Sequence, residues 1–169
     1  MKKLLLGSIA LVMIVLALAG CGKTTSSSSA TTKELTFNGQ TYTVPKEPQK
    51  IAVLSNSVLS MLYAVDGKAI SRANTTDKLA PELEALPALG QTANINMEQL
   101  LGLKPDVVLG LVNQHKKYES QLQANNIPTV LFDYDGIKDN VPMLTFLGEL
   151  TNHQDKAKSV INTYESNIT

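Results

Sequence analysis

The sequence predicts an α/β fold in which a parallel β-sheet is flanked by helices and preceded by a small β-hairpin. Three short, mainly apolar runs carry this prediction: Ile51–Leu54, Val107–Leu109 and Ile127–Phe132. Continuous runs of this kind are typical of parallel strands that are buried on both faces. Between them the apolar residues recur at helical spacing, so strands and helices alternate along the chain. This order indicates a Rossmann-like sheet with helices on both faces.

A β-hairpin is predicted over residues 34–48, ahead of the sheet. Its turn is Asn38-Gly39, because both residues tolerate the positive φ that a two-residue turn requires. Pro45 and Pro48 end the hairpin. Apolar residues alternate with polar ones on either side of the turn, namely Leu35, Phe37, Tyr42 and Val44.

Residues 49–152 form the predicted α/β lobe, in which each strand is followed by a helix. Gly67 closes the first helix. Asn96 is predicted to cap a later one, and Gln99 completes a capping-box pattern with it. The remaining elements are expected, in order, as a helix at Val58–Val65, a short strand beginning at Ala69-Ile70, a short helix at Pro81–Leu86, a polar helix at about His115–Asn125 and a helix at about Lys138–Leu150.

Residues 153–169 are predicted to begin a further helix. Ala157, Val160 and Tyr164 recur at helical spacing and form an apolar stripe that continues towards the last residues. No capping pattern ends this helix. We expect it either to fold back on the lobe or to continue beyond Thr169.

The N-terminus, residues 1–20, has the form of a secretory signal peptide, with a basic end, an apolar stretch and small residues before Cys21. The apolar stretch is shorter than the about 20 residues that a membrane-spanning helix needs. Leu18-Ala19-Gly20-Cys21 resembles the lipobox of bacterial lipoproteins, which implies cleavage before Cys21 and acylation of its thiol, for example with palmitate. We therefore expect a lipid-anchored chain on the extracytoplasmic face of the cell membrane.

Residues 21–33 are predicted to be a flexible tether, because this Ser/Thr-rich segment has no bulky apolar residue to bury. The 15 basic and 15 acidic residues balance, and no basic patch indicates a nucleic-acid partner. Cys21 is the only cysteine. Once it is lipidated, the chain has no thiol for a disulfide, a metal site or nucleophilic catalysis.

Some polar motifs have both a chemical and a purely structural interpretation. Ser55-Asn56-Ser57 follows the first strand at a helix N-terminus, which favours anions or simply needs capping. It lacks the glycine pattern of a dinucleotide site. His115 follows the strand at 107–112, where open α/β sheets place ligands, and could be a metal ligand. Lys116-Lys117 is either a cationic spot at this edge or a pair of solvated helix lysines.

Asp133-Tyr134-Asp135-Gly136 resembles the first motif of haloacid-dehalogenase-type phosphatases. In that family the first Asp is the nucleophile and the second is the general acid/base. Ile137 stands where that motif has Thr or Val, and three predicted strands precede a motif that normally opens the fold. The alternative is that Asp133 and Asp135 are acidic residues that end a strand.

A longer resemblance begins at Lys50. Its most specific part is Leu103-Lys104-Pro105-Asp106-Val107-Val108, which follows Leu89-Gly90-Gln91 and the capped helix from Asn96. In this order the segments resemble the substrate-binding lipoproteins of ABC importers for iron-siderophores, haem and cobalamin, the TroA-like class III periplasmic binding proteins. The other matching stretches are Lys50–Ser55, Leu62–Lys68, Thr76-Asp77, Phe132–Tyr134 and Leu147–Thr151.

The resemblance implies a two-lobed clamp whose lobes are joined by one long helix. The chain is then expected to hold the N-terminal lobe and the start of the inter-lobe helix, with the C-terminal lobe absent. Its partners would be an ABC permease and its ATPase. The implied function is capture of an iron complex rather than catalysis, without a cofactor or a resident metal. We expect such a half-receptor to bind its ligand weakly.

The resemblance also implies that strand-end loops line the ligand cleft and that Glu98 docks the permease. Capping or a favourable interaction with the helix dipole is the alternative for Glu98. The polar cleft suits an anionic ferric siderophore; haem is a further candidate, and a receptor for bare Zn²⁺ or Mn²⁺ that uses His115 is an alternative. The predicted cleft residues are Ser55, Asn56, Thr75, Thr76, Gln91, Asn94, Asn113, Gln114, His115, Lys116 and Tyr134.

Overall fold

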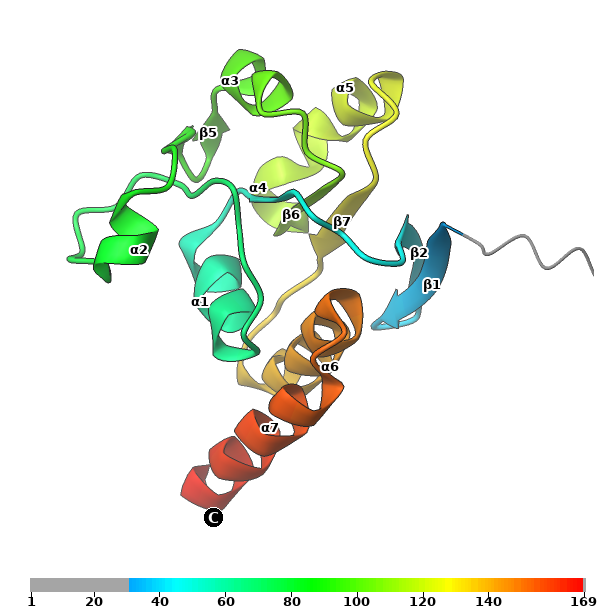
Figure 1. Ribbon diagram of the computed structural model, residues 1–169, viewed down its shortest axis with the longest axis vertical. Helices are drawn as coiled ribbons and strands as arrows, with labels where there is room; N and C mark the ends of the chain where they lie inside the picture. The colour runs from blue at the N-terminus through cyan, green and yellow to red at the C-terminus, as the bar shows by residue number, and fades with distance from the viewer. Residues whose placement is uncertain (1–30, 169) are drawn as a thin grey trace, which may run out of the picture.

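The computed structural model describes residues 31–168 (Figure 1). The predicted signal peptide, Cys21 and most of the predicted tether therefore lie outside the described residues. Seven strands are present in this part of the chain: β1 (Thr32–Phe37), β2 (Gln40–Pro45), β3 (Ile51–Val53), β4 (Gly90–Gln91), β5 (Asn94–Ile95), β6 (Val107–Leu111) and β7 (Thr129–Phe132). The helices are α1 (Asn56–Ala64), α2 (Pro81–Glu84), α3 (Met97–Gly102), α4 (Val112–His115), α5 (Glu119–Ala124), α6 (Asn140–Thr151) and α7 (Gln154–Ile168), with 3₁₀ turns η1 (Lys116–Tyr118) and η2 (Ile137–Asp139).

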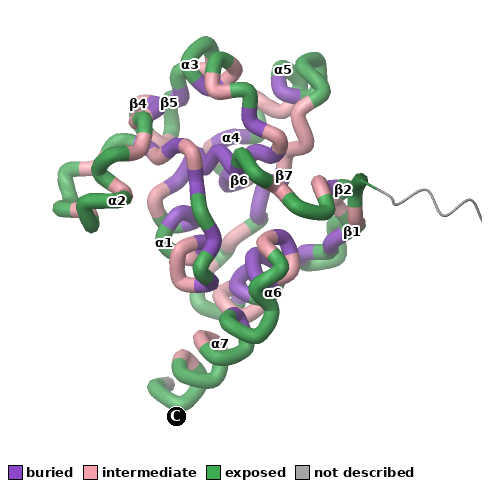
Figure 2. Tube along the Cα trace, in the orientation of Figure 1, coloured by how far each residue is buried: buried purple, intermediate pink, exposed green. Residues whose placement is uncertain are grey.

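The centre of the fold is a three-stranded parallel sheet in the order β3-β6-β7. Ile51 pairs with Val107, and Val108 pairs with Thr129. Every residue of β3 and β6 is buried, which explains why these strands appear in the sequence as unbroken apolar runs (Figure 2). The predicted α/β class, with a parallel sheet flanked by helices, is confirmed.

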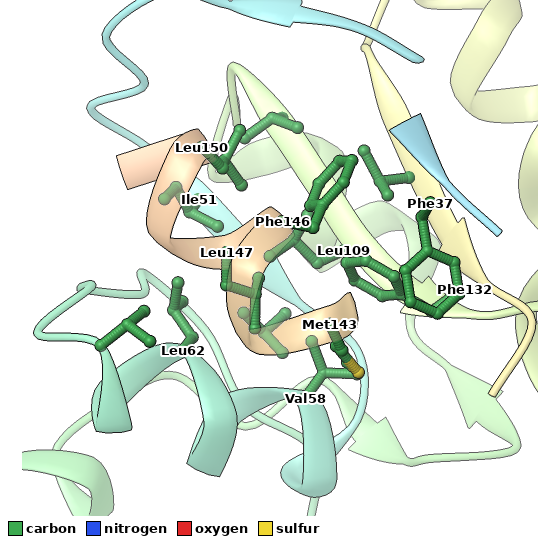
Figure 3. Close-up of a cluster of buried hydrophobic side chains, with 14 of the residues drawn as sticks. Phe37, Ile51, Val58, Leu62, Leu109, Phe132, Met143, Phe146, Leu147 and Leu150 are labelled. Atoms are coloured by element: carbon green, nitrogen blue, oxygen red, sulfur yellow. The ribbon is translucent and has the colours of Figure 1, made fainter. Parts of the chain in front are cut away.

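Successive residues of the strands point into two separate cores. On one face Val53 and Leu109 pack with α1, α6 and the hairpin, in the cluster drawn in Figure 3. On the other face Ala52 and Val108 pack with Leu100 of α3 and, through Leu122, with α5. The alternation follows from the two-residue period of a strand, and it places helices on both faces of the sheet.

The predicted hairpin forms and is part of the first core. Asn38 and Gly39 have φ of 46° and 81°, as a type I′ turn requires. The ring of Phe37 meets that of Phe132 edge to face, with centroids 5.0 Å apart. Strand β1 begins at Thr32, two residues before the predicted start, because Lys33 is fixed to the end of α6 by hydrogen bonds to the carbonyl oxygens of Glu149 and Leu150.

Two expected elements take a different form. The strand predicted from Ala69-Ile70 is absent; instead the Ile70 amide donates one hydrogen bond to the Ile51 carbonyl at 2.9 Å, and Arg72 forms an isolated bridge with Ala88. The sheet therefore has three parallel strands rather than four. The single helix predicted over His115–Asn125 is also wrong: α4 ends at His115, the 3₁₀ turn η1 follows, and α5 begins at Glu119.

The last helix packs against the helix that precedes it. Ala157 of α7 is buried against Gly148 of α6, and Val160 and Ile161 are half-buried in the same core. Beyond these residues α7 extends past the rest of the lobe to the C-terminal end (Figure 1). Of the two outcomes expected from the sequence, contact with the lobe is present from Ala157 as far as Tyr164, whose hydroxyl accepts a hydrogen bond from Asn140. Within residues 31–168 no helix is both long enough and apolar enough to cross a membrane.

Candidate functional site

The carboxyl ends of β3, β6 and β7 lie at one edge of the sheet, where open α/β folds bind their ligands. Ser55 and Asn56 follow β3 and begin α1. Ser55 is only 3% exposed, and its Oγ lies 2.8 Å from Oγ of Ser57. Asn56 is half-buried and reaches out of the sheet towards the next loop. Of these two residues, Ser55 is therefore buried and Asn56 is the one that is partly exposed at this edge.

Asn56 connects the end of β3 to the loop at residues 74–76. Its Nδ2 donates to the carbonyl oxygen of Asn74 at 3.2 Å, and the Asn74 amide in turn donates to the carbonyl oxygen of Gly90 at 2.7 Å. These bonds bring three segments together that are far apart in the sequence. Between them lies an open depression of about 450 Å³ lined by Asn74, Thr75, Thr76 and Gln91.

Three of the four residues that line this depression are among the predicted cleft residues. The fourth, Asn74, was missed, although it directly precedes Thr75 and Thr76 and binds the backbone of Gly90. Asn94 is exposed and pairs with Gln91 across the short β4–β5 hairpin, so it belongs to the same region. All of these side chains are amides or hydroxyls, which both donate and accept hydrogen bonds.

Tyr134 follows β7 and is half-buried. Its hydroxyl donates to Oδ1 of Asn140 at 2.6 Å, and Nδ2 of Asn140 donates to the hydroxyl of Tyr164 in α7 at 3.1 Å. With Ser57 and Leu111 it lines a cavity of only about 10 Å³, which is too small for a ligand. Tyr134 is thus a link between the sheet edge and the last two helices.

The prediction that His115 lines the cleft is corrected by its surroundings. Its ring is completely buried, and both nitrogens bind backbone groups. Nδ1 accepts from the Leu111 amide at 2.8 Å, so Nε2 carries the proton and donates to the carbonyl oxygen of Thr92 at 2.7 Å. Burial is the main cause that lowers the pKa of the imidazole from its ordinary value. His115 therefore has no free lone pair to offer a metal ion or another ligand.

The polar residues next to His115 lie along the same edge but not at the depression. Asn113 is exposed and Gln114 is half-buried. The ammonium of Lys116 pairs with the carboxylate of Glu119 at 2.6 Å, and both residues line a second depression of about 420 Å³ between the hairpin and the ends of β6 and β7. Asp133 also borders this second depression.

The two aspartates of the phosphatase-like motif are not arranged as a reaction centre. Asp133 is exposed, and Asp135 pairs with exposed Lys138 at 2.7 Å. In residues 31–168 there is no group of three or more His, Cys, Asp or Glu that could hold a metal ion, such as the magnesium that phosphoryl transfer uses. The motif is therefore accounted for as a strand end followed by a turn.

Asp139, which the sequence did not single out, is the carboxylate that this loop depends on. It is 4% exposed and accepts hydrogen bonds from the Asp135 amide at 2.7 Å and from Nδ2 of Asn38 at 2.9 Å. The bond from the Asp135 amide is the largest cause that lowers the pKa of Asp139. Asp139 thereby ties the tip of the β-hairpin to the segment after β7.

Glu98 lies in the first turn of α3, whose N-cap Asn96 accepts a hydrogen bond from the Gln99 amide at 3.0 Å as predicted. Asn96 performs the capping, so Glu98 is not needed for it. Glu98 is exposed and forms no ion pair with any residue between 31 and 168. Its carboxylate is available to a partner outside the lobe.

Comparison with known proteins identifies the fold and the family. The sequence profile of the periplasmic binding protein family matches residues 51–169. The probable siderophore-binding lipoprotein YfiY of Bacillus subtilis is 28% identical over 99% of this chain and 55% of its own length. A vitamin B12-binding protein of Pectobacterium carotovorum subsp. carotovorum is 25% identical over 72% of this chain and 45% of its own.

The crystal structure of a periplasmic solute binding protein from Veillonella parvula superposes with a TM-score of 0.70 and 26% identity, covering 80% of this chain and 45% of that one. The chain spans about half the length of the curated relatives that it matches. Because the family profile covers the whole α/β lobe and the last helix, the chain belongs to the periplasmic binding protein family. The family expected from the sequence is confirmed.

Proposed function

We propose that this member of the periplasmic binding protein family is the solute-binding component of an ABC importer and that its ligand is a ferric siderophore or a related iron complex. Its relative YfiY of Bacillus subtilis, 28% identical, is named as a probable siderophore-binding lipoprotein. We further propose that Cys21 carries the lipid that holds the protein at the extracytoplasmic face of the cell membrane. In this account the chain binds its ligand and catalyses no reaction.

One observation supports an iron complex over a bare ion. The depression at the sheet edge is lined by neutral amides and hydroxyls from separate segments, Asn74, Thr75, Thr76 and Gln91, while the imidazole of His115 is buried. A bare Zn²⁺ or Mn²⁺ requires several imidazole or carboxylate ligands held close together. An iron complex brings its own ligands and needs only hydrogen-bonding partners, which these side chains supply.

The depression is proposed as one wall of the site. Sites for small molecules bury about 70–90% of the ligand surface, and an open depression cannot do so. Since the chain spans about half the length of its relatives, the opposite wall is proposed to be a second lobe. We propose that Asn56 and Asn94 border this wall. Farther along the same edge we propose further polar contacts from Asn113, Gln114 and Lys116, although the ammonium of Lys116 is already paired with Glu119.

Glu98 is proposed as a docking residue for the permease. Its carboxylate is exposed on α3, which covers the face of the sheet opposite α1 and α6. An unpaired carboxylate in this setting can accept both arms of an arginine guanidinium. The permease, with its ATPase, would release the ligand by separating the two walls.

Vitamin B12 is the second candidate ligand, because one relative is a vitamin B12-binding protein. Like an iron-siderophore complex, it presents many amide groups to a polar wall. Haem, which is largely apolar, fits a wall of amides and hydroxyls less well.

Equilibrium dialysis of the purified protein tests the proposal. The probes are ferric enterobactin, ferric desferrioxamine B, ferric citrate, haemin, cyanocobalamin and zinc chloride. We expect at least one ferric complex to bind, and Gln91→Ala to weaken that binding about fivefold, the effect of losing one hydrogen bond of about 1 kcal/mol. Gln121→Ala, on the exposed side of α5, is the matched control. Binding of zinc or cyanocobalamin alone, or an equal effect of the two variants, would overturn the proposal.

A further inference from the structure

Three side chains from one short segment hold the backbone of a turn at the proposed ligand wall. The turn comprises residues 92–95: the two residues that connect β4 to β5, and β5 itself. Nε2 of His115 donates to the Thr92 carbonyl at 2.7 Å, and the Lys117 ammonium donates to the Ala93 carbonyl at 2.6 Å. We call these two contacts, together with a third one from Tyr118, the turn clamp.

The third contact of the turn clamp comes from Tyr118. Its hydroxyl accepts the hydrogen bond of the Ile95 amide at 2.9 Å. Its ring also stacks beside that of His115, with centroids 6.4 Å apart. Four consecutive residues of the turn thus receive three side-chain contacts, all from residues 115–118, and a two-stranded hairpin of this length needs such support to hold its shape.

The clamp is fixed at its other end by the central sheet. The Leu111 amide, at the end of β6, donates to Nδ1 of His115 at 2.8 Å. Gly110 makes room for the ring, since a Cβ at this position would lie 2.8 Å from Nδ1. The imidazole is therefore a bridge between the buried strand β6 and the exposed turn.

We infer that His115 is a positioning residue for the proposed ligand wall: its neutral ring holds the 92–95 turn so that Gln91 faces the depression, and protonation of the ring releases the turn. This inference rests on the proposed function in one respect, that Gln91 contacts the ligand. The physical reason for release is that Nδ1 accepts a hydrogen bond from the Leu111 amide. An imidazolium would place a second N–H against that donor.

The charges around the ring agree with this assignment. Burial lowers the pKa of His115 most, the hydrogen bond to the Thr92 carbonyl raises it, and the ammonium of Lys117 lowers it further. Lys116 is paired with Glu119. No carboxylate of the described residues acts on the ring to stabilise the imidazolium, so acid disrupts the clamp rather than strengthening it.

Hydrogen exchange of the whole chain, measured without ligand from pH 7.5 to pH 5, tests the inference. The amides of Leu111 and Ile95 report the two ends of the clamp. We expect their protection factors to fall with decreasing pH, by at most about tenfold per pH unit since one proton is bound. The fall should persist in His153→Gln, which alters the only other histidine, and vanish in His115→Gln, whose amide can still donate to Thr92.

A second pair of variants keeps the inference testable if His115→Gln does not fold. Lys117→Met should lower the protection of the Ile95 amide several-fold at pH 7.5, whereas Lys116→Met should leave it unchanged. Protection that is independent of pH in the native chain, or an acid transition that survives in His115→Gln, overturns the inference. So does an equal effect of the two lysine variants.

Failure of the proposed function has a different signature. If the clamp behaves as expected but none of ferric enterobactin, ferric desferrioxamine B or ferric citrate binds, His115 positions the turn and the proposed ligand is wrong. If a ferric complex binds through Gln91 while protection of the turn ignores His115 and Lys117, the ligand assignment stands and the clamp is wrong.

Discussion

Gly148 of α6 lies directly against Ala157 of α7. A Cβ built on Gly148 would come closer to the Ala157 Cβ than two carbon atoms can approach. The two helices can therefore pack at this distance only because position 148 has no side chain. This contact sets the direction in which α7 leaves the lobe (Figure 1).

The first prediction concerns this contact. Gly148→Ala should destabilise the fold by about 1–3 kcal/mol, because the added methyl group forces α6 and α7 apart. Gly102→Ala is the matched control: it lies in α3, where a new Cβ meets nothing within 4 Å. That variant should be neutral or stabilising by up to about 1 kcal/mol. Urea unfolding measures the free energy of unfolding of both variants. Equal losses in the two variants would contradict the account of the α6–α7 contact.

The second prediction is a dependence of stability on pH. Burial lowers the folded-state pKa of His115 below its ordinary value of about 6.5. The unfolded chain then binds more protons than the folded chain below about pH 6.5, so stability is complete above that pH and falls as pH drops towards the folded-state value. His115→Gln should lose this dependence and His153→Gln should retain it. Urea titrations at pH 7.5, 6.5 and 5.5 measure it.

The third prediction concerns the anchoring of β1. The Lys33 ammonium binds the carbonyl oxygens of Glu149 and Leu150 and Oδ1 of Asn152. The first two are among the last carbonyls of α6, where a positive charge is favoured. Lys33→Met should therefore cost about 1 kcal/mol and lower Tm by about 3–5 °C. Lys50→Met, at the exposed start of β3, provides the comparison; a larger loss in that variant would refute the proposed role of Lys33.

The fourth prediction concerns Asp139. Its pKa is lowered chiefly by the hydrogen bond from the Asp135 amide, so the folded chain holds the carboxylate ionised to lower pH than the unfolded chain does. The resulting stability is present above about pH 3.8 and is lost as pH falls through the folded-state value. Asp139→Asn should lower Tm at pH 7 and raise the pH of acid unfolding. Asp133→Asn, on an exposed residue of the same loop, should change neither.

Much of the fold was predictable because local chemistry and the tertiary structure agree. The Asn38-Gly39 turn takes the positive φ that its residues tolerate, and Asn96 caps α3 through the Gln99 amide. The absence of the strand expected from Ala69 was not predictable in this way. Its apolar residues suit a strand, but the backbone of Ile70 meets β3 at only one hydrogen bond before the chain turns towards Ala88.

The sequence predicted which residues lie near the candidate site, but not which groups their side chains contact. The rule that ligands bind at the carboxyl ends of parallel strands selected Asn56, Thr75 and Gln91, which the structure brings into one region. It could not show that His115 turns inward, since this depends on where the backbone of Thr92 lies. The sequence did hold one signal: Gly110 interrupts a buried strand, and a glycine there indicates the close approach of another group.

The most direct test of the central claim locates the ligand on the protein. The amide NMR spectrum of ¹⁵N-labelled protein is recorded with ferric enterobactin, an anionic complex whose iron broadens nearby signals even when binding is weak, and with the diamagnetic gallium complex as control. We predict broadening by the ferric complex at residues 55–57, 74–76 and 91–94, and none at Lys50, Asp106 and Thr129 at the opposite edge. Broadening centred on that opposite edge, or spread evenly over the lobe, would contradict the proposal that the carboxyl edge of the sheet is the wall of an iron-complex site.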